Sequence, residues 1–259
     1  MATRGVDVAG VVEAVGSEVT GVAVGDEVFG SARGSFAELA LSTPKRLAPL
    51  PVGVPFEQAA ATPMAGYTAL QALRAAGLEG VGDGEGRRVL VIGAGGGVGS
   101  FAVQLAKLFG AHVTGVCSTS KVSLVRSLGA DEVVDYTRDA VTGRFDVVIE
   151  TAGGRSLAES RELLTERGVL VIVGGEGGGR VFGLFGRTLA APFTSMRGKQ
   201  KLLGLMATES RDDLIRLGEL LAAGSLRAAV DRTFTLDEAP DAIAYLAEGR
   251  AAGKVVVVP

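Results

Sequence analysis

The sequence predicts an α/β fold that combines a doubly wound parallel sheet with a smaller domain of short β-strands. Three observations support this. From residue 88 to about 207, short apolar strands alternate with helical patterns and short links, which is typical of a parallel sheet. The first fifty residues contain short strands interrupted by glycine, as in small antiparallel barrels. A glycine cluster at 93–99 separates one apolar strand from an amphipathic helix.

The N-terminal region is expected to begin with strands and then change to helices. Gly5–Val15 alternates as a strand does, and Val19–Phe29 has the pattern of a turn followed by a strand. Ser35–Leu41 is expected to form a third strand. Helical spacing then takes over in Phe56–Ala61 and Pro63–Ala75, where proline suits the first turn.

The middle of the chain supplies the strands of the parallel sheet. Val89–Ile92 is rich in β-branched residues and carries no charge, so it is expected to be buried on both faces. The later strands are expected at His112–Cys117, Val133–Asp135, Phe145–Glu150, Val169–Val173 and Lys201–Ala207. Beyond them, helices are expected to start at Ser210 and Thr235, each followed by an acid three residues later, and Val255–Val258 closes the chain as a strand.

Composition and charge exclude several classes of function. A net charge of −3 and a pI near 5.4 leave no basic surface for nucleic acid. Val89–Ala106 has no charged residue, but it divides into strand, glycines and helix, so we expect no membrane span. The single cysteine, Cys117, permits no intramolecular disulfide, and no apolar signal segment is evident. We therefore expect a cytoplasmic protein.

The glycine cluster is predicted to bind a dinucleotide. Glycines let the backbone approach a pyrophosphate, and the N–H groups at the start of the following helix stabilise its negative charge. The strict G-x-G-x-x-G pattern is absent, and an ordinary tight turn is the alternative. With a strand before and a helix after the cluster, we assign cofactor binding to Gly95, Gly96, Gly97, Val98 and Gly99.

The end of the second strand of the parallel sheet, His112–Cys117, predicts NADPH as the cofactor. An NAD enzyme usually places an acid there to bind the ribose hydroxyls, whereas this chain has no acid until Asp131. Ser118 can donate a hydrogen bond to a phosphate, and Lys121 adds a positive charge in the next turn. A solvated helix charge is the alternative role for Lys121.

A count of ligands argues against zinc. A catalytic zinc needs three protein ligands and a structural zinc needs four, but the chain has only His112 and Cys117 besides its carboxylates. Without a metal to polarise an alcohol, hydride transfer to an already activated acceptor remains feasible. Quinones and α,β-unsaturated carbonyls are such acceptors.

Several segments together resemble the medium-chain dehydrogenase/reductase superfamily, in its zinc-independent quinone oxidoreductase-like branch. The matching segments are GVDVAGVVEAVG (5–16), VGDEVFG (24–30), GSFAELA (34–40), AAATPMAGYTALQAL (59–73), VLVIGAGGGVGSFAVQLAK (89–107), LGADEVVDY (128–136) and GKVVVV (253–258). The resemblance implies a GroES-like β-barrel domain at 1–63, a Rossmann NAD(P)-binding domain at 64–209 and a return to the GroES-like domain at 210–259. Family members begin upstream of Gly5, so we expect the barrel to lack its first strands.

Further site residues follow from the resemblance and from position in the fold. The resemblance implies that Thr68 lies beside the nicotinamide, that Tyr136 borders the phosphate of NADPH and that Lys254 lies near the cofactor. Val173, Gly174 and Gly175 end a sheet strand at its carboxyl edge, where open α/β sheets bind ligands. The glycine-rich segment 176–186 is expected to be either a mobile cover or a plain connection. No catalytic residue is assigned.

These expectations combine into one function with two alternatives. We expect an NADPH-dependent oxidoreductase that reduces a quinone or an activated C=C bond of an α,β-unsaturated carbonyl. An enoyl-thioester reductase of the same superfamily and a non-catalytic NADPH-binding protein remain open. A homodimer is expected through Lys201–Ala207, because this apolar strand would lie at the sheet edge, and the resemblance points the same way.

Overall fold

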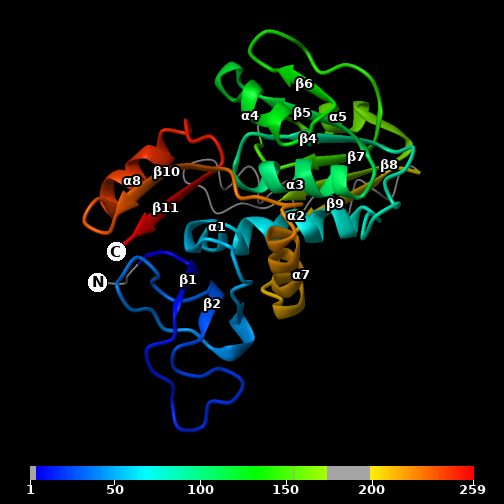
Figure 1. Ribbon diagram of the computed structural model, residues 1–259. Coiled ribbons are helices and arrows are strands. Elements are labelled where there is room, and N and C mark those ends of the chain that lie inside the picture. Colours follow the sequence, from blue (N-terminus) through cyan, green and yellow to red (C-terminus); the bar gives the residue numbers. More distant parts are fainter. Residues whose placement is uncertain (1–3, 154, 174–198) are drawn as a thin grey trace. The chain divides into compact units, whose positions relative to one another are not determined.

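The chain folds into two compact units (Figure 1). The computed structural model describes residues 4–153, 155–173 and 199–259. One unit is formed by residues 68–207, and the other by residues 1–67 together with residues 208–259.

The unit of residues 68–207 is built on a parallel sheet, which confirms the predicted fold class. Its described strands are β4 (Arg88–Ile92), β5 (His112–Cys117), β6 (Glu132–Asp135), β7 (Phe145–Glu150), β8 (Leu164–Val173) and β9 (Lys201–Leu205). Their spatial order is β6-β5-β4-β7-β8-β9, and every neighbouring pair is parallel. This is the Rossmann order, in which the direction of winding reverses between β4 and β7.

Apolar side chains at the centre of the sheet hold this unit together. Leu90 on β4, Val148 on β7 and Leu170 on β8 have no exposed surface, because helices cover the strands. The helices are α3 (Gly97–Leu108), which packs on β4 and β5, α4 (Val122–Ser127), which packs on β5 and β6, and α5 (Leu157–Glu162), which packs on β8. The burial of strands on both faces explains why their apolar runs identify them in the sequence.

The second unit joins both ends of the chain. An antiparallel sheet contains β1 (Asp7–Val11), β2 (Glu27–Ser31) and β3 (Leu47–Pro49), with the 3₁₀ turn η1 (Pro44–Arg46) before β3. The helix α1 (Phe56–Ala60) follows, and α2 (Pro63–Ala75) begins in this unit and continues into the other one. The last part of the chain supplies α7 (Arg211–Ala222), β10 (Val230–Thr235), α8 (Ala239–Ala247) and β11 (Lys254–Val258). The strands β10 and β11 pair in parallel.

Tyr67, near the start of α2, is a buried residue of this second unit. Its side chain is 1% exposed, and its hydroxyl has no hydrogen-bond partner among the described residues. Burial raises the pKa of Tyr67, and the carboxylates of Glu209, Asp7 and Asp213 raise it further. The phenol is therefore neutral in the folded chain.

One predicted strand of this unit was wrong, and two of its strands were not predicted. Ser35–Leu41 is not a strand: the segment makes only the isolated bridge between Arg33 and Leu41, and Leu39 and Leu41 stay largely exposed. Alternation alone does not form a strand when no neighbour offers a ladder of hydrogen bonds. The strands β3 and β10 were not predicted, because their pairing depends on partners elsewhere in the chain.

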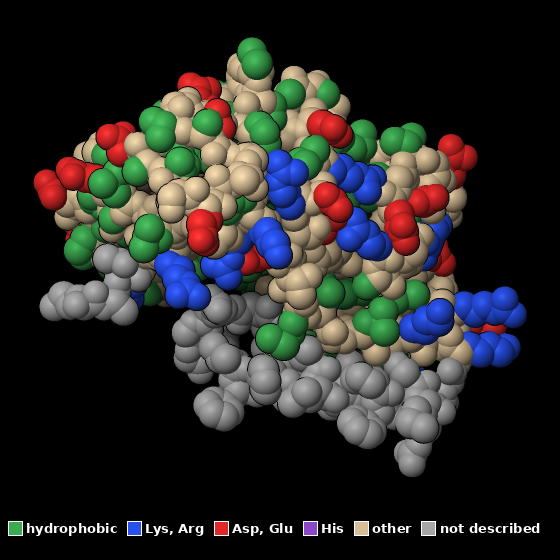
Figure 2. All heavy atoms as spheres, turned by 90° about the horizontal axis from the view of Figure 1, so that it is seen from below, with side chains coloured by type: hydrophobic (Ala, Val, Ile, Leu, Met, Phe, Trp, Pro, Cys, Tyr) green, Lys and Arg blue, Asp and Glu red, His purple; other side chains and the backbone are tan. Residues whose placement is uncertain are grey.

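Among the described residues, none of the helices is both long and apolar enough to cross a membrane. On the face shown in Figure 2, Lys and Arg side chains are interspersed with Asp and Glu. This mixture agrees with the small net charge of −3.

Candidate cofactor-binding site

The predicted glycine turn lies at the carboxyl end of β4, beside the point where the winding of the sheet reverses. Gly93 opens it with a φ of +85°, a conformation that favours glycine. The N–H groups of Gly93 and Ala94 both donate to the carbonyl of Val116 on β5. On the other side, the Thr151 hydroxyl donates to the carbonyl of Ile92 at 2.9 Å. The turn is thus held by both neighbouring strands.

Two glycines of the turn occupy positions that a side chain could not share. A Cβ on Gly99 would lie 2.1 Å from the carbonyl oxygen of Gly93, which is backbone and cannot rotate away. A Cβ on Gly95 would lie 2.7 Å from the Cβ of Lys121. The Lys121 side chain therefore packs directly against Gly95, so the structure brings these two predicted residues together.

The turn leads into the N-terminus of α3. Gly96 is the N-cap residue and has no side chain to cap the helix, and the first turn carries no acid. Gly97, Val98 and Gly99 form that first turn, where helix N–H groups lack intrahelical acceptors. Such N–H groups and the helix dipole favour an anion. The turn and the helix start therefore fit the pyrophosphate of a dinucleotide.

The second predicted contact region follows β5. Ser118 is the N-cap of a short 3₁₀ turn, η2 (Thr119–Lys121), which runs directly into α4. Ser118 and Lys121 are half-buried, and their polar groups lie at the two ends of this turn. The sequence between Cys117 and Lys121 contains no acid.

Tyr136 joins this region from the end of β6. Its N–H donates to the carbonyl of Cys117, and 61% of the residue is exposed. The structure therefore places Tyr136 beside the end of β5, where the turn η2 begins. Its exposed ring is available to a ligand.

The structure adds a network of hydrogen bonds that the sequence did not reveal. One Asp135 oxygen accepts from the hydroxyl of Thr119, and the other accepts from the N–H and hydroxyl of Thr137 at 3.0 Å and 2.7 Å. Arg138 lies 3.6 Å from the first of these oxygens. The hydrogen bond from Thr119 is the largest cause of the lowered pKa of Asp135, followed by those from Thr137, against the opposing effect of burial.

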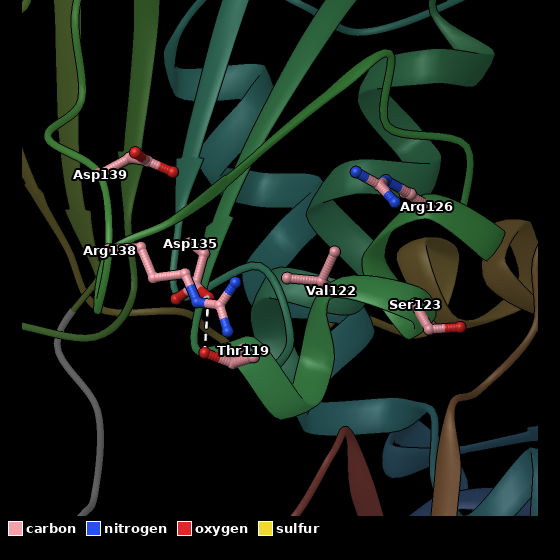
Figure 3. A pocket seen from close by; sticks show the side chains of 7 residues that line it. All are labelled: Thr119, Val122, Ser123, Arg126, Asp135, Arg138 and Asp139. Carbon is pink, nitrogen blue, oxygen red and sulfur yellow. Dashed lines mark hydrogen bonds and ion pairs between the residues drawn. The ribbon is translucent and has the colours of Figure 1, made fainter.

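A pocket of about 490 Å³ opens beside this network (Figure 3). Its lining residues come from η2, α4, the last residue of β6 and the segment that follows β6: Thr119, Val122, Ser123, Arg126, Asp135, Arg138 and Asp139. In Figure 3 the Arg138 side chain points toward Asp135 and Thr119, whereas Arg126 and Asp139 lie at opposite sides of the pocket.

The remaining predicted site residues lie elsewhere in the two units. Thr68 is buried in α2 at 7% exposure, and Val173 is the last residue of β8. Gly174 and Gly175 lie outside the described residues, as does the segment 176–186. Lys254, at the start of β11, belongs to the second unit, where its ammonium lies 3.1 Å from Asp7.

Among the described residues, no three His, Cys, Asp or Glu side chains come together as a metal site. His112 and Cys117 are the first and last residues of β5, and His112 faces Asp131 and Glu132. The spacing of His112 and Cys117 along one strand does not suit a shared ion.

Comparison with known proteins agrees with this geometry. Residues 2–52 match the model of the alcohol dehydrogenase GroES-like domain, and residues 128–257 match that of the zinc-binding dehydrogenases. The chain is 36% identical to a chloroplast envelope quinone oxidoreductase homolog from Arabidopsis thaliana, over 98% of this chain and 78% of the relative. The chain belongs to the medium-chain dehydrogenase/reductase superfamily. Within it, the chain belongs to the zinc-independent, quinone oxidoreductase-like branch.

Two further proteins are similar to this chain. A 2-methylene-furan-3-one reductase from Solanum lycopersicum is 36% identical, over 98% of this chain and 63% of that protein. The Escherichia coli quinone oxidoreductase solved in complex with NADPH is 25% identical, with a TM-score of 0.81, over 98% of this chain and 82% of that one.

Proposed function

We propose that this chain is an NADPH-dependent oxidoreductase that transfers hydride to a quinone or to the activated C=C bond of an α,β-unsaturated carbonyl. The names of the relatives from A. thaliana and S. lycopersicum describe these two classes of acceptor. The NADPH complex of the E. coli relative supports the choice of cofactor.

One observation carries the cofactor assignment. The stem of Lys121, which follows β5, packs on Gly95, so a cation is held next to the glycine turn at the end of β4. The same end of β5 has no acid that would bind ribose hydroxyls. This combination favours a nucleotide that carries a phosphate at the ribose.

Different residues of the chain would bind different parts of NADPH. The first-turn N–H groups of α3 stabilise the pyrophosphate, and Gly95 and Gly96 allow its close approach. Ser118 and Lys121 bind the 2′-phosphate, with Tyr136 at its border. When bound, NADPH supplies the hydride, and positioning of the acceptor is left to the protein.

The cofactor assignment is tested by exchanging Lys121. A charge-assisted contact to a phosphate is worth about 1.5–3 kcal/mol, so Lys121→Ala should weaken NADPH binding by roughly tenfold to more than a hundredfold. NADH binding should change little. Lys107→Ala is the matched control, because it removes an equal charge from a lysine that pairs with Asp131. Equal affinity of the parent chain for NADPH and NADH would disprove the assignment.

Turnover separates the enzyme from a non-catalytic NADPH-binding protein. The parent chain is mixed with NADPH and either a simple quinone or a simple enone, and cofactor oxidation is followed at 340 nm. We expect turnover with at least one of the two acceptors. Tight NADPH binding without turnover of either acceptor would favour the non-catalytic alternative.

We also propose that the chain forms a homodimer through β9. Within the described residues this strand has a hydrogen-bonded neighbour, β8, on one side only, and the residues near its end include Met206, which is 70% exposed. Unpaired N–H and C=O groups at such an edge can bond an identical strand across a two-fold axis. Light scattering at micromolar concentration tests this proposal, and a monomer would contradict it.

We place the protein in the cytoplasm, as the sequence predicts. The single cysteine, Cys117, is buried and unpaired, which suits a reducing compartment.

A further inference from the structure

Asp135 connects the ends of two neighbouring strands. It is the last residue of β6 and lies opposite Cys117, the last residue of β5. Through the Thr119 hydroxyl its carboxylate reaches into the turn η2, and through Thr137 it stabilises the backbone after Tyr136. The hydroxyls of Thr119 and Thr137 are themselves 3.0 Å apart. One carboxylate therefore links the segment of Ser118 and Lys121 to the segment of Tyr136.

The carboxylate is committed to these bonds rather than open to a ligand. Asp135 is only 8% exposed, and both of its oxygens accept hydrogen bonds from the protein. Arg138 lies over it and further offsets its charge. An acid that is bound in this way is poorly suited to the role of the ribose-binding acid of an NAD enzyme, because three of its roughly four acceptor positions are already used.

Asp135 could either weaken or strengthen the binding of a phosphate by this region. A carboxylate near a phosphate site should weaken phosphate binding by repulsion if its charge were its only contribution. A carboxylate that orders a flexible binding turn should strengthen it, because the cost of ordering the turn is then met before the ligand binds. The two contributions predict opposite effects when Asp135 is removed.

We propose that Asp135 is a positioning residue that determines the preference for NADPH over NADH by holding η2 in the conformation that presents Ser118 and Lys121. This inference rests on the proposed function, since it assumes that Ser118 and Lys121 bind the 2′-phosphate. Asp135 itself does not touch the cofactor. It acts through Thr119 and through the backbone at Thr137.

The test compares the affinities of four chains for NADPH and NADH by titration calorimetry. Asp135→Ala removes the network and should lower the preference for NADPH about tenfold, with little change in NADH affinity. Asp135→Asn can still accept from Thr137 and can donate to Thr119, so it should keep most of the preference despite losing the charge. Asp139→Ala removes an acid from the same pocket without touching the network, and it should not lower the preference.

Each other outcome overturns the proposal in a recognisable way. If Asp135→Ala and Asp135→Asn both bind NADPH more tightly than the parent, the charge of Asp135 outweighs its positioning. If Asp135→Ala weakens NADPH and NADH equally, Asp135 supports the fold alone. If Asp135→Ala does not fold, Thr119→Val decides, because it keeps the carboxylate and breaks the link; an unchanged preference in that variant refutes the proposal.

The two proposals fail differently. A parent chain with no preference for NADPH refutes the cofactor assignment. A parent that prefers NADPH, with Asp135→Ala unchanged in that preference, refutes only the role of Asp135.

Discussion

The substitution Gly99→Ala tests whether the glycine turn is as tightly packed as the structure indicates. Gly99 lies in the first turn of α3, and a Cβ there would lie 2.1 Å from the Gly93 oxygen, 2.7 Å from the Gly93 carbonyl carbon and 2.8 Å from the Cα of Ala94. All three atoms are backbone. The methyl group therefore cannot be accommodated by a side-chain rotation, and the turn itself must move.

Two effects of opposite sign determine the stability of this variant. Alanine in place of glycine in a helix normally stabilises by about 1 kcal/mol. Overpacking typically costs about 1–3 kcal/mol, and contacts with fixed backbone belong at the upper end of that range. We expect a net loss of about 1–2 kcal/mol, which lowers the unfolding temperature by roughly 2–8 °C in a chain of this size.

Cofactor binding should suffer more than stability. To relieve the contact, the turn must shift by about 1 Å, which displaces the N–H groups proposed to bind the pyrophosphate. A hydrogen bond to a charged group is worth about 1.5–3 kcal/mol, so losing one should lower the affinity for NADPH roughly tenfold to more than a hundredfold. The assay is calorimetric unfolding together with titration of NADPH. Gly96→Ala is the matched control for stability, because Gly96 is extended (φ −96°, ψ 178°) and its Cβ would meet only the Gly93 oxygen, at 3.3 Å.

Comparison of the two variants tests whether Gly99 packs against the backbone of Gly93. Gly96→Ala should lower the unfolding temperature less than Gly99→Ala does, since its one contact, at 3.3 Å from the Gly93 oxygen, is relieved by a much smaller shift of the backbone. A Gly99→Ala chain that unfolds at or above the temperature of the parent would show that the turn yields easily to a methyl group. The inferred packing of Gly99 on Gly93 would then be wrong.

Three further predictions concern the other unit and metal dependence. Tyr67→Phe should stabilise the chain by about 1 kcal/mol at neutral pH, because it removes a buried hydroxyl without a partner among the described residues. Folding raises the pKa of Tyr67, so the neutral phenol is favoured in the folded chain. The stability linked to this protonation is fully present below the unfolded pKa of about 10 and is lost as the pH rises from there through the folded pKa. Urea unfolding at pH 8 and pH 10.5 should therefore show a smaller alkaline loss of stability in Tyr67→Phe than in the parent. Lys254→Met and Asp7→Asn should show a coupling of about 1 kcal/mol in a double-mutant cycle, and additive effects would refute the ion pair. Chelator treatment should leave turnover and unfolding temperature unchanged; stoichiometric zinc lost together with activity would contradict this.

Much of the parallel sheet could be predicted from local sequence. The limits predicted for β5, β7 and α2 agree with the structure. Strands buried on both faces require continuous apolar runs, and a helix covering a sheet requires apolar residues at helical spacing, so the sequence must display both patterns. The limit predicted for the edge strand was less accurate, since β9 ends at Leu205 rather than at Ala207.

Pairing between distant segments was harder to predict. β10 has the polar sequence VDRTFT and becomes a strand by pairing with β11, while the better alternation of Ser35–Leu41 yields only one bridge. Strand formation depends on a partner that completes the hydrogen bonds, and local periodicity does not identify that partner.

For the candidate site, the sequence by itself determined the chemical types: a glycine turn before a helix, a serine and a lysine without an acid after β5, and too few ligands for zinc. Those features are local, because they depend on backbone freedom and charge within a few residues. Only the tertiary structure shows that Lys121 packs on Gly95 and that Asp135 links the turn η2 to the end of β6. Both contacts join segments that are distant in sequence, and they arise because parallel strands end at the same edge of the sheet.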